Sequence, residues 1–380
     1  MNNDRNTQFL KVKKESANKL LNLIKSRYRD NQIINKRKKI IQIEDYILFP
    51  LIKSGEEINK LVENETIDFV CEIVNTKAEF DPNYKFRTIE EALATELPEN
   101  IINLIPKSYD IIGNIAIIEF DRFTSLHQDK ASSYKKAVAE AIIKVNKKVE
   151  TVYEKTSEVK GKFRLKELQL LVGNDNPETT HKENNCTFKL NVKNMYFTPR
   201  LVFERKRLSL LNFTKNEVIV DMFAGVGPIS IQIAKTNEVQ IYSFDINPMA
   251  YRYIVENVNL NKLRGNVLTY NMDVAELMKS SNELGNILKE NVDRVIMNLP
   301  EQSMNYLDTA CFLTKKSGGL LHFYQFCEKP NSIENGIEKL SSILNKLGWR
   351  LEEILNSKIV KPFSPKSDLI VVDAKIKCSQ

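Results

Sequence analysis

Asp221-Met222-Phe223-Ala224-Gly225-Val226-Gly227-Pro228 is the segment around which this chain is organised, because it connects the apolar run of residues 218–220 to a helix-like stretch. Glycine allows a positive φ and lets the backbone approach a ligand more closely than any Cβ permits. The start of the following helix presents free N–H groups. A strand, a glycine turn and a helix at this spacing predict a cradle for a nucleotide-like cofactor, with Phe223, Gly225 and Gly227 in the turn.

Polar residues also follow the next predicted strands along the chain. Asp245 ends the run of residues 241–244, Asp273 ends the next apolar stretch, and Asn298 begins an Asn-Leu-Pro turn after the fourth. A carboxylate at Asp245 can accept hydrogen bonds from ribose hydroxyls. Asp273 can accept a hydrogen bond from an adenine amino group, and an Asn-x-Pro turn in an amino-methyltransferase places an amide against the nucleobase. Four ordered sites at successive strand ends predict a binding site more strongly than any one motif does.

The residues around the turn favour one cofactor over another. A dinucleotide site usually has the pattern G-x-G-x-x-G, and here Ser230 stands at the third glycine position. Asp221 directly precedes the turn, where its carboxylate would repel a phosphate but can bind a cationic amino group. S-adenosyl-L-methionine carries an ammonium and a sulfonium and no phosphate. The sequence therefore predicts S-adenosyl-L-methionine as the cofactor and disfavours an NAD-dependent dehydrogenase.

The second half of the chain has the pattern of an α/β domain. From residue 200 onward, predicted strands alternate with predicted helices, which indicates a parallel sheet with crossover helices. Two last strands, residues 350–360 and 369–376, are joined by a turn at residues 362–365. They predict an antiparallel hairpin at the sheet edge, which is typical of class I methyltransferases. The expected fold class is α/β, a class I (Rossmann-like) S-adenosylmethionine-dependent methyltransferase domain after a small α+β domain and an N-terminal domain.

Three domains are expected, and they comprise residues 1–107, 108–199 and 200–380. The first boundary is placed in the proline-bracketed residues 98–106. In the first domain, hydrophobic spacing predicts a basic helix over residues 8–28. In the middle domain, the pattern predicts a helix over residues 134–146 and strands over residues 111–120, 163–172, 179–182 and 187–192.

Composition limits the class of protein. The chain has 56 Lys and Arg against 49 Asp and Glu, a formal net charge of +7, which permits a nucleic-acid partner without establishing one. Its five cysteines form no C-x-x-C pair and it has three histidines, so neither a disulfide framework nor a metal site is predicted. No apolar stretch is long enough for a bilayer. We expect a cytoplasmic protein with no membrane partner, and a mitochondrial matrix or nuclear pool stays an alternative.

Several segments together resemble one family. They are residues 152–155, 161–164, 168–173, 180–186, 197–205, 221–228, 245–248 and 298–300. Their combination is similar to the archaeal and eukaryotic tRNA (guanine-37, N1) methyltransferases over residues 111–372. The resemblance implies methyl transfer to N1 of guanosine 37 and a tRNA partner bound at its anticodon stem-loop. It also implies that the N-terminal domain contacts the outer corner of the tRNA, and we expect a monomer.

The resemblance also implies roles for individual residues. Glu204 would be the general base for N1–H, and Arg164 would meet the negative charge that develops on O6. Asn298 and Pro300 would orient the base. Tyr196 and Arg200 would shape the pocket for the target nucleotide. The implied cofactor-binding residues are Asp221, Phe223, Gly225, Gly227, Asp245, Ile246, Asp273 and Asn298.

Other interpretations compete with this one. A wybutosine-pathway aminocarboxypropyltransferase acts on tRNA with the same cofactor, and Pro300 favours methyl transfer over it. A non-catalytic tRNA-binding protein is disfavoured because the expected catalytic and cofactor residues occur together. Taken without the resemblance, Glu204 is an acid on a charged helix face among neighbouring arginines, and Arg164 lies on the solvated face of a strand.

Overall fold

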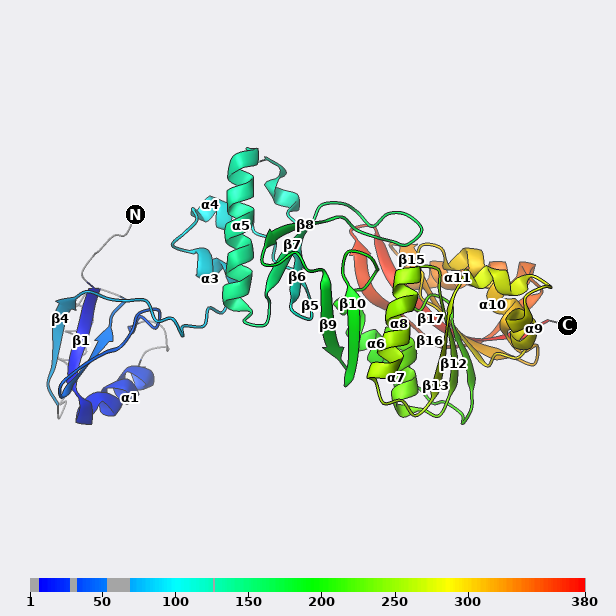
Figure 1. The fold of residues 1–380 in the computed structure, drawn as a ribbon, viewed down its shortest axis with the longest axis horizontal. Helices are drawn as coiled ribbons and strands as arrows, with labels where there is room; N and C mark the ends of the chain where they lie inside the picture. The colour runs from blue at the N-terminus through cyan, green and yellow to red at the C-terminus, as the bar shows by residue number, and fades with distance from the viewer. Residues whose placement is uncertain (1–6, 28–32, 53–68, 126, 380) are drawn as a thin grey trace. The chain divides into compact units, whose positions relative to one another are not determined.

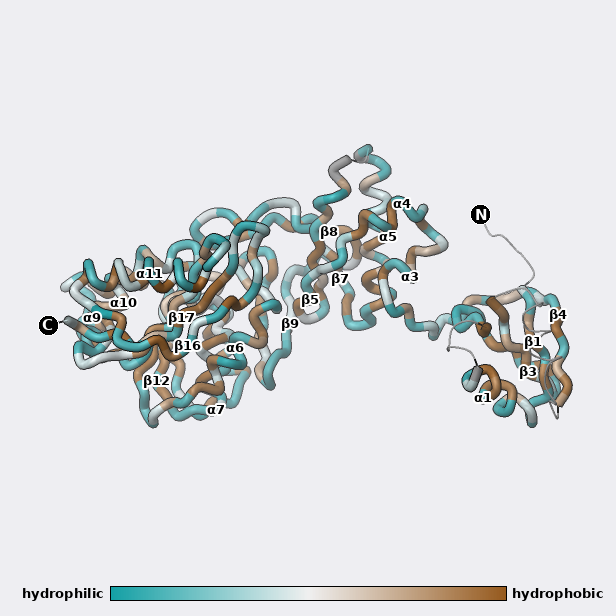
Figure 2. The backbone as a smooth tube through the Cα atoms, turned by 180° about the vertical axis from the view of Figure 1, so that it is seen from behind, coloured by the Kyte–Doolittle hydropathy of each residue, from teal (hydrophilic) through white to brown (hydrophobic). Residues whose placement is uncertain are grey.

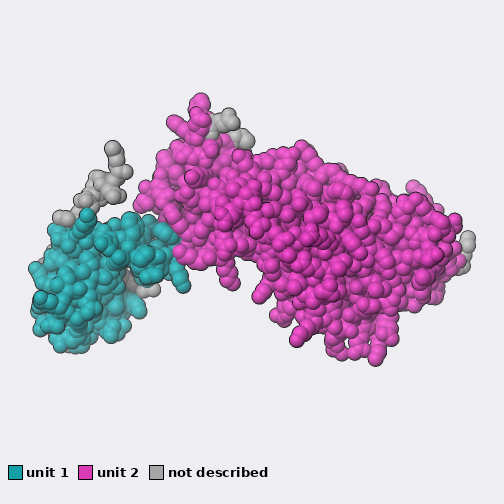
Figure 3. Space-filling view, viewed as in Figure 1, with its two compact units in different colours: residues 1–87 teal, residues 88–380 magenta. Residues whose placement is uncertain are grey.

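The computed structural model describes residues 7–27, 33–52, 69–125 and 127–379 (Figure 1). The chain divides into two compact units, residues 1–87 and residues 88–380 (Figure 3). Each unit has its own buried apolar residues, so the two are described separately. The sites discussed below all lie in the second unit.

The first unit is a four-stranded antiparallel sheet with a helix packed on it. The strand order is β2-β3-β1-β4, and its core includes Leu10, Leu20 and Phe49. The expected helix over residues 8–28 is wrong in its first half, because residues 7–13 form the central strand and pair with neighbours on both sides. This pairing outweighs the local helical spacing, and residue 28 lies outside the described residues. The elements are β1 (Thr7–Lys13), α1 (Ala17–Arg27), β2 (Ile41–Ile43), β3 (Tyr46–Pro50) and β4 (Cys71–Thr76).

The boundary between the units lies at Arg87 and Thr88, about twenty residues before the expected one. Two short helices, α3 (Ile89–Leu93) and α4 (Glu99–Ile102), belong to the second unit, and α3 packs against α5 (Gln128–Val145). Their apolar side chains are buried, as those of Leu93 and Ile101 show. The prolines that suggested a linker instead flank α4, since Pro98 caps its start.

The first part of the second unit holds a four-stranded sheet and a separate hairpin. The sheet order is β5-β6-β7-β8, and α5 crosses between the parallel strands β6 and β7. The expected strand over residues 111–120 is divided at Gly113, whose φ is +59° and where a Cβ would lie 2.1 Å from Thr179 Oγ1. The strands are β5 (Asp110–Ile112), β6 (Ile115–Ile118), β7 (Thr151–Lys155) and β8 (Leu168–Val172), with the hairpin β9 (Glu178–Glu183) and β10 (Cys186–Asn191).

The second part is a seven-stranded sheet in the order β13-β12-β11-β14-β15-β17-β16. The first five of these strands are parallel, and the antiparallel hairpin β16–β17 occupies one edge, which confirms the sequence prediction. The order reverses between β11 and β14, and ligands bind at such switch points. The strands are β11 (Val218–Asp221), β12 (Gln240–Asp245), β13 (Asn266–Asn271), β14 (Arg294–Met297), β15 (Gly319–Glu328), β16 (Trp349–Ser364) and β17 (Ser367–Cys378).

Helices cover both faces of this sheet, as an α/β fold requires. Leu208 and Ile233 pack on one face, and Leu313 and Leu340 pack on the other. Figure 2 shows hydrophobic residues along the strands between them, in agreement with the buried side chains of β17. The helices are α6 (Val202–Ser209), α7 (Pro228–Thr236), α8 (Pro248–Leu260), α9 (Glu283–Leu288), α10 (Leu307–Leu313) and α11 (Ser332–Lys346).

Two features are absent from the residues that the structure describes, 7–27, 33–52, 69–125 and 127–379. None of the helices in them combines the length and the apolar character that a membrane span needs. Within the same ranges, no three His, Cys, Asp or Glu side chains are grouped so that they could hold a metal ion.

Candidate active site

The glycine turn lies at the carboxyl ends of the central parallel strands. Gly225 and Gly227 have φ values of +57° and +84°, and Gly227 caps the start of α7. A Cβ at Gly227 would lie 2.7 Å from Ile254 Cγ1, so this residue brings the turn close to α8. The Gly225 N–H donates a hydrogen bond of 2.8 Å to the carboxylate of Asp245 at the end of β12. The turn and the neighbouring strand end therefore form one rigid element.

A cavity of about 290 Å³, here called the strand-end cavity, opens beside this turn. Most of the expected cofactor residues line it. Asp221 and Gly227 do not, because Asp221 is fully buried and Gly227 is packed against α8. The expected residues that line this cavity are Phe223, Gly225, Asp245, Ile246, Asp273 and Asn298.

The two acids of the strand-end cavity are fixed by backbone amides. Asp245 accepts hydrogen bonds of 2.8 Å from the N–H groups of Gly225 and Asn247. Burial raises the pKa of Asp245, and these two amides oppose that rise. Asp273 accepts a hydrogen bond of 3.1 Å from the N–H of Ala275. Each carboxylate is held in place and keeps further acceptor capacity for a ligand.

Asp221 lies behind the turn. One of its carboxylate oxygens accepts a hydrogen bond and the other has no hydrogen-bond partner. Ser230 donates a hydrogen bond of 2.7 Å to Oδ2, and Ser243 donates one of 2.8 Å to Ser230. Oδ1 is buried and has no hydrogen-bond partner in the structure. Burial raises the pKa of Asp221 to about 6, with the Ser230 bond opposing that rise. Because Asp221 lines neither cavity, its expected contact with a cationic cofactor group stays a prediction, and the hydroxyl of Ser230, at the third glycine position, orients this acid behind the turn.

Replacing Asp245 by alanine is expected to weaken cofactor binding. The change removes the acceptor for ribose hydroxyls and leaves the Gly225 N–H without its partner. A charged hydrogen bond contributes about 1.5–3 kcal/mol, so the dissociation constant should rise roughly 10-fold to 100-fold. Calorimetry with S-adenosylhomocysteine measures this change. Asp308→Ala, at an exposed acid on α10, is the matched control and should bind the ligand as the unmodified chain does.

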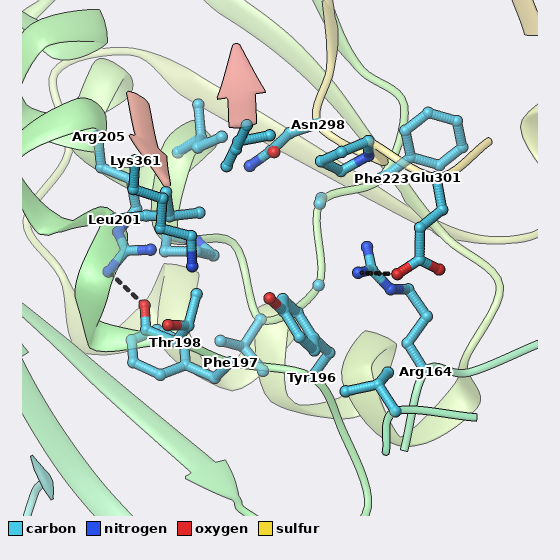
Figure 4. A pocket seen from close by; sticks show the side chains of 18 of the residues that line it. Arg164, Tyr196, Phe197, Thr198, Leu201, Arg205, Phe223, Asn298, Glu301 and Lys361 are labelled. Carbon is cyan, nitrogen blue, oxygen red and sulfur yellow. Dashed lines mark hydrogen bonds and ion pairs between the residues drawn. The ribbon is translucent and has the colours of Figure 1, made fainter. Parts of the chain in front are cut away.

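A second cavity of about 180 Å³, here called the hairpin cavity, adjoins the first. Glu301 lies on one side of it and Lys361 of β16 on another (Figure 4). Pro300 and Phe363 also line this cavity. The two cavities share part of their walls, so a ligand in one can contact a ligand in the other. The shared residues are Arg164, Tyr196, Phe223, Gly225 and Asn298.

Arg164 lies where these cavities meet. The sequence predicted a strand through this residue, but the strand begins only at residue 168 and Arg164 ends a tight turn with φ +55°. Its guanidinium lies over the Tyr196 ring at 4.6 Å, and its Nη2 donates a hydrogen bond of 3.1 Å to Glu301. Its buried Nε has no partner. A residue of this type in the left-handed region stores strain, which functional sites tolerate because it aims a side chain.

Glu204 is not placed as the sequence predicted, since it lines neither cavity. It faces β15–β17 from α6, its exposure is 5%, and its carboxylate accepts bonds of 2.6 Å from Arg207, 2.7 Å from Lys358 and 2.7 Å from Tyr324. Burial alone would raise the pKa of Glu204, but these three donors outweigh burial and lower it. In this structure the Glu204 carboxylate is held ionised in a buried network outside both cavities, so its role as the general base stays a prediction.

Arg200 also lies elsewhere than expected. Its Nε donates a hydrogen bond of 2.7 Å to Asp110, and it lines a separate polar cavity together with Lys155 and Lys166. It therefore does not shape the hairpin cavity directly. Tyr196 and Pro300, by contrast, both line that cavity, and their contact with the target nucleotide stays a prediction.

Four residues of the site were missed by the sequence analysis. Tyr306 contacts Phe223 edge to face, with ring centroids 5.0 Å apart, in the strand-end cavity. Glu301 directly follows the Asn-Leu-Pro turn, and this position in the sequence could have indicated that it lies in the site. Phe363 lies within the residues that were expected to be a turn, and Lys361 lies between them and the expected strand, so only the length of β16 revealed the two residues.

Comparison with known proteins identifies the family. The model of the TRM5/TYW2 methyltransferase domain matches residues 179–352, and the model of the TYW2 N-terminal domain matches residues 89–176. The tRNA (guanine(37)-N(1))-methyltransferase Trm5b of Pyrococcus abyssi is 35% identical over 280 residues, which cover 74% of this chain and 78% of that protein.

Solved structures agree with these matches. The complex of aTrm5 and tRNALeu has a TM-score of 0.71 and 28% identity, and the match covers 97% of this chain and 99% of that one. Methanocaldococcus jannaschii TYW2 in complex with AdoMet has a TM-score of 0.53 and 27% identity, covering 71% of this chain and 100% of that one. With the glycine turn, the strand-end acids and the edge hairpin in place, the chain belongs to the tRNA (guanine-37, N1) methyltransferase family, within the TRM5/TYW2 group.

Proposed function

We propose that this chain transfers a methyl group from S-adenosyl-L-methionine to N1 of guanosine 37 in tRNA. The observation that carries the proposal is the pair of adjoining cavities. The strand-end cavity supplies acceptors for the ribose and adenine of the cofactor, and the hairpin cavity is lined by Asn298 and Pro300. Arg164 and Tyr196 lie on the wall between them, where the methyl group and the target nitrogen must meet.

The chemistry requires charge stabilisation on the guanine. N1 carries a proton, and its removal places negative charge on O6. The Arg164 side chain lines both cavities, and a guanidinium directed at a developing oxyanion stabilises the transition state more than the ground state. The bound cofactor supplies the electrophilic methyl group on its sulfonium, and the residues of this chain position the base against it.

The target base must leave the anticodon loop to enter the hairpin cavity. The Tyr196 ring is available to stack on the extruded base. Lys155, Lys166 and Arg200 line the neighbouring polar cavity and can meet backbone phosphates of the anticodon stem-loop. We infer that the N-terminal unit contacts the outer corner of the tRNA and that the chain acts as a monomer in the cytoplasm.

The second candidate is aminocarboxypropyl transfer, because the TYW2 relative shares the fold and is bound to AdoMet. Two observations favour methyl transfer. The aTrm5 structure matches 97% of this chain, whereas the TYW2 structure leaves more than a quarter of it unmatched. Pro300 is also present in the Asn-Leu-Pro turn and lines the hairpin cavity.

The test is the nucleoside formed on a defined substrate. The purified chain is incubated with labelled cofactor and with two tRNA transcripts that differ only in G37 or A37, and the products are digested and separated. We expect 1-methylguanosine from the G37 transcript alone. Equal modification of both transcripts, no modification of either, or an aminocarboxypropyl product would each reject the proposal.

A further inference from the structure

The wall of the hairpin cavity carries a pair of stacked aromatic rings. Phe326 of β15 and Phe363 of β16 both line this cavity, and their ring centroids are 3.9 Å apart with an interplanar angle of 28°. The two rings meet over β17, because Leu369 of that strand pairs with Phe326 on one side and with Lys361 on the other. The stacked pair therefore joins three strands at the edge of the sheet.

The two rings differ in exposure. Phe326 packs against buried apolar side chains that include Leu208 of α6, whereas the Phe363 side chain is 56% exposed. Phe326 covers one face of the Phe363 ring, so the other face is open. The end of the hairpin is fixed as well, since the hydroxyl oxygens of Ser364 and Ser367 lie 2.7 Å apart. A ring held on one face and open on the other is a platform on which a planar base can stack at little cost in conformational entropy.

A cation without a counter-ion lies two residues before Phe363. Lys361 lines the same cavity, and Figure 4 shows its side chain extending into it. Among the residues that the structure describes, Lys361 forms no hydrogen bond or ion pair. Burial lowers the pKa of its ammonium, as expected for a cation that lacks a counter-ion. An anionic ligand group beside Lys361 would supply the missing charge.

The other two cations that line this cavity already have carboxylate partners. Arg164 bonds to Glu301 at 3.1 Å, and Arg205 bonds to Glu183 at 2.5 Å. Lys361 is thus the cation that stays free for a ligand. A nucleotide carries one phosphate and one planar base, so an open aromatic face next to an unpaired ammonium fits a nucleotide.

The position of Phe363 indicates which nucleotide this is. Tyr196 lines both cavities, so a base stacked on it lies next to the cofactor. Phe363 lines the hairpin cavity but not the strand-end cavity. A base stacked on Phe363 is therefore on the side away from the cofactor, and it is not the base that receives the methyl group.

We propose that Phe363 stacks on the base of a nucleotide that flanks guanosine 37, with Lys361 at the phosphate of the same nucleotide. This inference rests on the proposed function. The stack replaces contacts that the flanking base loses when the target base turns out of the anticodon loop. Every base has a π-face, so the contact accepts any flanking base and acts on tRNA affinity rather than on the chemical step.

The first test compares variants of Phe363 under single-turnover conditions. Phe363→Ala should raise the dissociation constant for the G37 transcript about 10-fold, as the loss of one base–aromatic stack does. The rate at saturating enzyme and the affinity for S-adenosylhomocysteine should stay unchanged, because the ring lies outside the strand-end cavity. Phe363→Trp should restore binding. Phe363→Leu, which keeps apolar bulk without a π-face, should not.

The matched control is Phe203→Ala. The Phe203 side chain is 84% exposed on α6 and lines neither cavity, so this variant should bind the transcript as the unmodified chain does.

The second test removes the base instead of the ring. Full-length tRNAs are assembled by ligation with a base-free ribose at position 36 or at position 38. At one of the two positions, the missing base should weaken binding to the unmodified chain about 10-fold. The same missing base should weaken binding to Phe363→Ala no further, because the two changes remove one contact.

Several results would overturn the inference. Phe363→Ala could bind the transcript as tightly as the unmodified chain, or Phe363→Leu could restore binding, which would make the contact merely apolar. The losses from the variant and from the missing base could add at both positions. A slower chemical step with normal tRNA affinity would place the target base itself on Phe363. Each of these results requires an unmodified chain that methylates G37, so each rejects this inference alone. An unmodified chain that does not methylate G37 rejects the proposed function as well.

Discussion

Replacing Arg164 by alanine is expected to slow methyl transfer by about 10²–10³-fold under single-turnover conditions, as the loss of one donor to a developing oxyanion does in other enzymes. The side chain is 15% exposed, lines both cavities and carries a buried Nε without a partner. Its loss removes the charge that stabilises O6 in the transition state. It also leaves Glu301 without its ion-pair partner. Rapid-quench measurement of methyl transfer to the G37 transcript gives the rate.

Two control variants make this result specific. Arg164→Lys keeps the charge but lacks the planar fork of donors, so it should recover only part of the lost rate. Arg264→Ala removes an exposed arginine that pairs with Glu238 and should leave the rate unchanged. Calorimetry should show near-normal affinity of Arg164→Ala for S-adenosylhomocysteine. A variant that keeps its rate, or one that loses cofactor binding instead, would contradict the role given to Arg164.

The residues of the strand-end cavity were predictable, because the order of strands and turns along the chain determines where these residues lie. Parallel strands end at the same edge of a sheet, so polar residues at successive strand ends meet in space. Asp245, Asp273 and Asn298 therefore line one cavity, as the sequence indicated. The edge hairpin was predictable for a similar reason, since two strands joined by a short turn pair with each other.

The substrate half of the site depends on contacts that the order of the chain does not determine. Arg164 reaches the cavity from a turn whose positive φ has no glycine to signal it. Two of the three partners of Glu204, Tyr324 and Lys358, come from strands more than a hundred residues downstream. The partner of Arg164, Glu301, lies in a turn 137 residues away. Charged residues on a helix or turn can face either solvent or a cavity, and the tertiary contacts decide which.

Replacing Glu204 by alanine is expected to lower the free energy of unfolding by about 3–5 kcal/mol, because breaking a buried ion pair leaves its partner charges without compensation. Arg207 also binds Asp373 at 2.6 Å, so the variant leaves a guanidinium with one of its two carboxylates. Urea unfolding at neutral pH measures the loss. Asn356→Ala removes a hydrogen bond from an uncharged donor to the Asp373 carboxylate at the rim of the same network and should cost about 1.5 kcal/mol.

The pH dependence of unfolding separates the structural role of Glu204 from a catalytic one. Its folded pKa is lowered, so its contribution to stability is present above the unfolded pKa of about 4.3 and is lost as pH falls through the folded value. Glu204→Gln should flatten this part of the stability curve, and its folded fraction should keep most of the methyl-transfer rate. If the variant instead keeps its stability and loses the chemical step, Glu204 reaches N1 after a rearrangement and acts as the base that the resemblance implies.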